Sequence, residues 1–391
     1  MHVSRSALFI LVGIFCASGA WYAFQKTGGY PEVATFSRHT ASFETISEEL
    51  ESIAKKKGAV YAYEVLKRVP LPPGTDLHLL GHVVGNVLYQ QKGPAGMTFC
   101  TQDFRNACSH SIVVSAFQEK GDAALPEIRE ACKKAPGGSG AYLMCYHGLG
   151  HGILAYADYD LPKTIALCKK TGTAAFHDGE YHQCVGGAIM ELMGTGGHAA
   201  KKLDEARKRY LTKPLAPCFE SFMPREVRSS CLIYLTPQIW SDVGMDRGNP
   251  DMALLPQAFR VCKTIPVSET HLRDACFGGF GKEFPGIVNN RDSRNINQLP
   301  EEAMVTMSQW CSVAGVRDGE RYCIQAILKF LFWGGENDPA LSFRFCRVIP
   351  DQEQKNDCYS QLAIEIQQYI KGPQQSGLCA QLPSRYRCYE R

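Results

Sequence analysis

Apolar residues recur at helical spacing along most of the chain, beginning near residue 43. Residues 43–69 are predicted to be helical with a break at Gly58, because apolar side chains recur there three or four residues apart at Ile46, Leu50, Ile53, Val60 and Tyr63. The proline-rich stretch 70–73 ends this helix. A second helix is predicted from Asp76, a good N-cap, to about Gln91. These two segments form a helical hairpin without cysteines.

Sixteen of the seventeen cysteines follow in pairs after this hairpin. The two members of a pair lie 8 to 16 positions apart, and consecutive pairs lie 21 to 35 positions apart. Amphipathic runs precede the pairs and apolar runs follow them, which predicts a repeat of helix, cysteine, turn, cysteine and helix. One disulfide would close each hairpin, although spacing alone does not fix the connectivity. The predicted pairs are Cys100 and Cys108, Cys132 and Cys145, Cys168 and Cys184, Cys218 and Cys231, Cys262 and Cys276, Cys311 and Cys323, Cys346 and Cys358, and Cys379 and Cys388.

Several hairpins open with a capping residue followed by proline in the first turn, where its missing N–H costs nothing. The stretches are Asp160–Pro162, Asn249–Asp251 and Asp338–Pro339. The predicted fold class is all-α, a solenoid of helical hairpins (α/α repeats) stapled by disulfides. In this architecture residues 43–391 resemble the Sel1-like and tetratricopeptide-type helical-repeat solenoids in a secreted, disulfide-stapled form.

The N-terminal residues 1–24 are predicted to be a signal peptide or a signal anchor. Arg5 precedes an apolar run from Ala7 to Phe24, and Ser18–Ala20 offers small residues for cleavage. The polar residues 25–42 are predicted to be a tether. In either case the rest of the chain faces the periplasmic or extracellular side, where disulfides persist. The membrane is a partner only through this anchor, if it is uncleaved.

The remaining chain divides into three predicted parts. Residues 43–194 are N-terminal helical repeats that contain most histidines, residues 195–378 are C-terminal helical repeats, and residues 379–391 form a cap closed by its own disulfide.

The net charge is +3 and the basic residues are scattered, so no nucleic-acid partner is expected. The paired cysteines lack CxxC spacing, which favours structural disulfides over a metal or redox site built from cysteine.

Eight of the eleven histidines lie between His78 and His198, and two pairs share the pattern His-x-x-Gly-His. A helix places histidines four residues apart on one face, where they can bind a transition metal such as Zn, Cu or Fe together. Small residues beside them allow neighbouring helices to approach closely. Without such convergence, equivalent positions on stacked helices lie about 8–10 Å apart, too far for one ligand shell. The candidate metal ligands are His78, His82, His110, His147, His151 and His182.

Three functions agree with these features. The leading hypothesis is an exported helical-repeat binding protein with a histidine-rich, transition-metal-binding site in its N-terminal half. One alternative is a plain protein–protein interaction scaffold that binds a protein partner on its concave face, with incidental histidines. The other is a metal-dependent enzyme that uses the same histidines. The sequence assigns no catalytic residue, because it contains no nucleophile, phosphate-loop or zinc-protease motif.

Overall fold

The computed structural model shows an all-helical protein. The predicted signal segment 1–24 lies outside the residues that it describes. No helix within the described part is long and apolar enough to cross a membrane. The described residues are 29–36, 42–71, 75–136, 138–194, 200–246, 249–289, 296–334, 339–370, 372–386 and 388.

Eight helices form a central row in which each helix contacts the next one. They are α5 (Leu77–Lys92), α6 (Ala107–Lys120), α8 (Gly138–Tyr156), α10 (Gly179–Leu192), α12 (Arg228–Leu232), α15 (Thr270–Val288), α17 (Arg317–Gly334) and α19 (Gln352–Tyr369).

Further helices precede or flank this row. They are α2 (Glu32–Phe36), α3 (Phe43–Lys57), α4 (Ala59–Leu66), α7 (Leu125–Cys132), α9 (Leu161–Lys169), α11 (Ala200–Tyr210), α13 (Thr236–Asp242), α14 (Leu255–Lys263), α16 (Glu301–Ser312), α18 (Pro339–Val348) and α20 (Pro373–Gln381). Short 3₁₀ helices lie between them at Gly93–Phe99, Gly121–Ala124, Ala174–Phe176, Arg225–Val227, Met252–Leu254, Ile296–Gln298 and Ser384–Tyr386.

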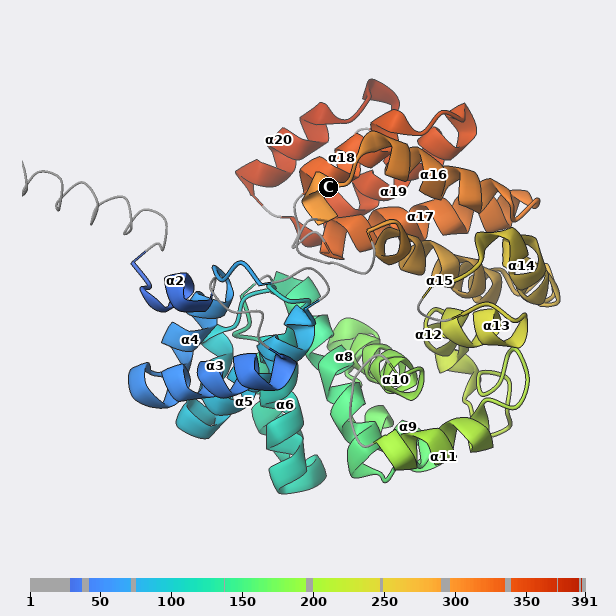
Figure 1. Ribbon diagram of the computed structural model, residues 1–391. Helices are drawn as coiled ribbons and strands as arrows, with labels where there is room; N and C mark the ends of the chain where they lie inside the picture. Colours follow the sequence, from blue (N-terminus) through green and yellow to red (C-terminus); the bar gives the residue numbers. More distant parts are fainter. Residues whose placement is uncertain are drawn as a thin grey trace, which may run out of the picture.

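The chain follows an arc from the N-terminal helices in blue, through α8 and α10 in green and α14 in yellow, to the orange and red C-terminal helices (Figure 1). Some C-terminal elements also contact N-terminal ones. Helix α19 contacts α8, and the guanidinium of Arg105, just before α6, lies 5.1 Å from the ring centroid of Phe330 in α17. Contacts between neighbours are therefore supplemented by contacts between segments far apart in sequence.

All eight predicted cysteine pairs are disulfide-bonded, which confirms the pairing within hairpins. Their Cα atoms lie 5.4–5.9 Å apart. In seven pairs the second cysteine lies inside a helix of the central row, so the bond joins that helix to the segment before it. Every cysteine in the described residues is bonded, and this number of disulfides is typical of a protein exported to an oxidising compartment.

Three details differ from the prediction at the ends of elements. Within the predicted tether, residues 32–36 form α2, because Val33 and Phe36 are apolar and become buried. Asp251 accepts from the backbone N–H of Ala253 and caps the helix that Asn249 was expected to start. Cys379 belongs to α20, so the chain has no break between residues 378 and 379. The predicted break at Gly58 is confirmed, with φ at +95°.

Glycines allow the central row to pack closely, as the sequence predicted. A Cβ atom on Gly187 of α10 would overlap the backbone carbonyl of His147 in α8, and one on Gly148 of α8 would overlap the ring of His110 in α6. One on Gly85 of α5 would lie 2.7 Å from Ser111 Cβ. Since glycine costs about 1 kcal/mol in a helix relative to alanine, the contacts that it permits offset this cost.

We predict opposite effects for two glycine substitutions in helices. Gly187→Ala should lower the free energy of unfolding by about 1–3 kcal/mol, because a backbone carbonyl cannot move away from the added methyl group. Gly377→Ala in α20 is the control, since this glycine is exposed and no atom lies within 4 Å of the added carbon. It should stabilise by up to about 1 kcal/mol. Urea unfolding measures both changes, and equal effects would contradict the close-packing argument.

Candidate functional site

Five histidines from α5, α6 and α8 lie together, and we call them the histidine cluster: His78, His82, His110, His147 and His151. The ring of His110 is central. Its centroid lies 5.8 Å from that of His78, and 6.0 Å from those of His82, His147 and His151. Within the two pairs the ring centroids are 4.6 Å and 5.1 Å apart.

Helical periodicity and glycine together bring these rings into contact. Spacing of four residues places both members of a pair on one face of α5 or α8. Gly148 directly follows His147 in α8. Because it has no side chain, the ring of His110 can occupy the space beside it. The predicted obstacle, a distance of about 8–10 Å between stacked helices, is overcome because His110 lies between the two pairs.

Hydrogen bonds fix which nitrogen of His78 and of His82 carries the hydrogen. Nδ1 of His78 lies 2.7 Å from the carbonyl oxygen of Phe104, and a carbonyl oxygen only accepts, so Nδ1 donates. Ser111 Oγ donates to the backbone carbonyl of His82 at 3.0 Å. The same oxygen therefore accepts from Nδ1 of His82 at 2.8 Å. When both rings are neutral, Nε2 of each therefore carries a lone pair.

These two Nε2 atoms face each other at 3.1 Å. One nitrogen from each of His78, His82 and His110 forms a set of donor atoms that all lie within 4.8 Å of one another. It is the one group of three or more histidine, cysteine or carboxylate ligands of this kind among the described residues. This group of three histidines can hold a metal ion.

The second pair is oriented by side chains of α10. Nδ1 of His151 lies 3.0 Å from the buried carboxylate of Glu191 and donates to it, which leaves the lone pair on Nε2. Nε2 of His147 lies 3.3 Å from the sulfur of Met190. A thioether sulfur only accepts, so the lone pair of His147 is on Nδ1. That Nδ1 atom is buried and has no hydrogen-bond partner.

A strained loop supplies the carbonyl that orients His78. Phe104, Arg105 and Asn106 have φ angles of 57°, 54° and 64°, and each such residue costs roughly 1–2 kcal/mol when it is not glycine. We call residues 101–106 the Phe104 loop. Its conformation turns the carbonyl of Phe104 toward His78, so the strain is stored beside the histidine cluster.

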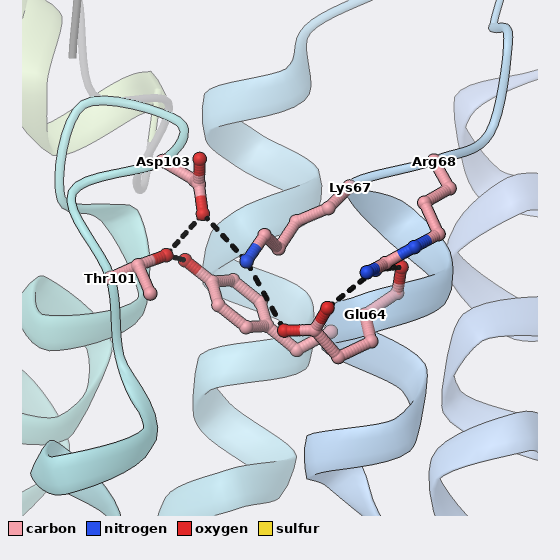
Figure 2. A network of polar contacts seen from close by, with 6 residues as sticks. Glu64, Lys67, Arg68, Thr101 and Asp103 are labelled. Carbon is pink, nitrogen blue, oxygen red and sulfur yellow. Dashed lines mark hydrogen bonds and ion pairs between the residues drawn. The ribbon is translucent and has the colours of Figure 1, made fainter. Parts of the chain in front are cut away.

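Helix α4 holds the Phe104 loop through the polar network in Figure 2, where Lys67 lies between two carboxylates. Its Nζ atom is 3.1 Å from both Glu64 and Asp103. Thr101 donates to Asp103, and Arg68 donates to Glu64. Burial by itself raises the pKa of Glu64, but hydrogen bonds from Arg68 and Lys67 outweigh it and lower the pKa. The network keeps Glu64 charged and ties the Phe104 loop to the end of α4.

Burial favours the neutral form of three rings of the cluster, His78, His110 and His147. It lowers the pKa of His78 to about 4, partly opposed by the hydrogen bond to Phe104. Burial also holds the pKa values of His110 and His147 well below the usual range of histidine, and the charge of neighbouring histidines lowers them further. Neutral imidazole is the form that binds metal.

The sixth candidate ligand, His182, and the buried Glu180 lie elsewhere on α10. His182 lies inside this helix, and its Nδ1 is 3.0 Å from Ser230 Oγ. Glu180 accepts hydrogen bonds from Tyr142 and Thr173. Neither residue makes a described ring contact or hydrogen bond with the histidine cluster.

The sequence draws attention to Glu191 as a nearby carboxylate but not to the other three partners that orient the rings. Ser111 follows His110, where a small residue favours close packing but does not by itself indicate a partner for His82. The carbonyl of Phe104 and the sulfur of Met190 gave no signal, because only the folded chain brings them to the rings.

No family model, curated protein or solved structure matches this chain. We therefore infer the function from the geometry and chemistry of the histidine cluster.

We predict that the metal-free protein loses stability in mild acid. The pKa of His78 is about 4 in the folded state and about 6.5 in the unfolded chain. Between these values the unfolded chain binds the proton more readily, so the free energy of unfolding falls as pH is lowered through this window. The melting temperature, measured in a chelator from pH 7 to 4, should show this fall.

The variant His78→Gln should show a smaller fall over the same pH range. His271→Gln changes an exposed histidine of α15 and should leave the fall unaltered. An equal fall in the protein and in His78→Gln would contradict the argument.

Proposed function

We propose that this protein binds a transition-metal ion through His78, His82 and His110. The observation that carries the proposal is the pair of Nε2 atoms that face each other at 3.1 Å, each with a lone pair. Two lone pairs at this distance repel each other, and a cation between them removes the repulsion. The tetrahedral zinc geometry with bonds of 2.0–2.1 Å places two ligand nitrogens about 3.4 Å apart, close to the observed separation.

The state of His110 supports the same proposal. Both ring nitrogens of His110 are buried and lack a hydrogen-bond partner. A buried polar group without a partner costs about 1–3 kcal/mol. Coordination by one nitrogen removes one of these costs, and His110 belongs to the group whose donor atoms lie within 4.8 Å.

The donor set favours a particular class of metal. Three neutral imidazoles suit zinc, copper, iron or nickel, whereas magnesium and calcium require oxygen ligands. Histidine ligands in metal sites usually donate their other N–H group to a carbonyl, hydroxyl or carboxylate. His78 and His82 have such partners in Phe104 and Ser111.

The wider proposal concerns place and architecture. We propose an exported protein, on the periplasmic or extracellular side, whose hairpins stack as a solenoid with the site near its N-terminal end. Eight disulfides and the consecutive contacts of the central row support this arrangement. A protein partner on the concave face stays a prediction.

Removal of one ligand should abolish tight metal binding. In His82→Gln, the tightest-bound zinc ion should be lost, because one of the two facing lone pairs disappears. Competition with a chelator at substoichiometric zinc measures this ion. Equal zinc affinity in His82→Gln and the unaltered protein would end the proposal.

A milder change tests the hydrogen bond that orients His82. Ser111→Ala should weaken zinc binding about 10–100-fold, the usual effect of losing such a partner. Ser115→Ala is the matched control, since Ser115 lies one turn further along α6 and contacts Asn86 instead. It should leave the zinc affinity unchanged. Circular dichroism checks that all three variants fold.

A further inference from the structure

His110 lies at the centre of the histidine cluster although neither of its ring nitrogens has a hydrogen-bond partner. Its ring lies between two histidine pairs, with centroid distances of 5.8–6.0 Å to all four rings. Both of its nitrogens are buried and without a partner. An ion held with His78 and His82 would bind only one of these two nitrogens of His110. The other still lacks a partner, and the second pair lies on the remaining side of the cluster.

The second pair offers two lone pairs of its own. Glu191 orients His151 so that Nε2 is the free donor, and Met190 orients His147 so that Nδ1 is the free donor. Nδ1 of His147 is buried without a partner. With the ring of His110, whose centroid lies 6.0 Å from both of theirs, these two histidines repeat the composition of the first group.

We propose that His110 bridges two metal ions as an imidazolate. This inference rests on the proposed function, because the first ion is the one held with His78 and His82. The second ion is held by the other nitrogen of His110 together with His147 and His151. When it binds, a nitrogen–metal bond replaces the remaining N–H bond of His110, and the proton leaves to solvent.

The negative charges nearby suit a pair of cations. The imidazolate contributes one negative charge between the ions, and Glu191 contributes another through its hydrogen bond to His151. Glu191 is fully buried, and a buried carboxylate is stabilised by cations close to it.

The two ions should bind with unequal strength. The donors of the first group already lie within 4.8 Å of one another, and His147 and His151 are not part of that group. The second ion must draw these rings toward His110, which costs free energy. Copper should therefore load in two steps, the first tighter than the second.

Titration with Cu²⁺, followed by electron paramagnetic resonance, tests the bridge. With one ion per chain the signal should account for all the copper. When the second ion binds, coupling through the imidazolate should reduce the integrated signal below the copper content. Elemental analysis should give two ions per chain, and one ion with a full signal in His147→Gln and in His151→Gln.

His182→Gln is the matched control, since His182 lies in α10 and contacts Ser230 outside the cluster. It should retain two coupled ions. One ion per chain in the unaltered protein would overturn the bridge and leave the proposed function intact, whereas two uncoupled ions would overturn the bridge alone. No bound ion would overturn the proposed function as well. Circular dichroism and disulfide content verify that the variants fold.

Discussion

The close approach of α5, α6 and α8 is the constraint on which the site depends. Helices of ordinary separation would hold their histidines too far apart for shared coordination. Gly148 removes this limit at the ring of His110, and Gly187 brings α10 against α8, so that Glu191 can reach His151. The same glycines therefore lower the intrinsic stability of each helix and allow the histidine rings to meet.

The disulfides and the histidine cluster join different parts of the structure. Seven of the eight disulfides join a helix of the central row to the segment before it, and so hold that helix against its own hairpin. The rings of the cluster then meet across three successive helices of the row. Because every cysteine in the described residues is bonded, these cysteines offer no thiolate beside the imidazoles.

Much of this could be predicted from the sequence, because periodicity and spacing are local signals. The alternation of short and long gaps between cysteines predicted all eight disulfides, and the repeated pattern His-x-x-Gly-His singled out both histidine pairs of the cluster. His182 was included among the ligands by proximity along the chain, but α10 turns it toward Ser230. The carbonyl of Phe104 escaped prediction because its direction depends on three residues with positive φ.

The contact between Arg105 and Phe330 gives the Phe104 loop a second role. The loop that presents a carbonyl to His78 also meets α17, a helix more than 200 positions later in the chain. His78 is thus oriented by a segment that contacts both the N-terminal and the C-terminal helices. An N-terminal fragment that folds by itself would lack α17 and its contact with this loop. The orientation of His78 therefore depends on both ends of the arc.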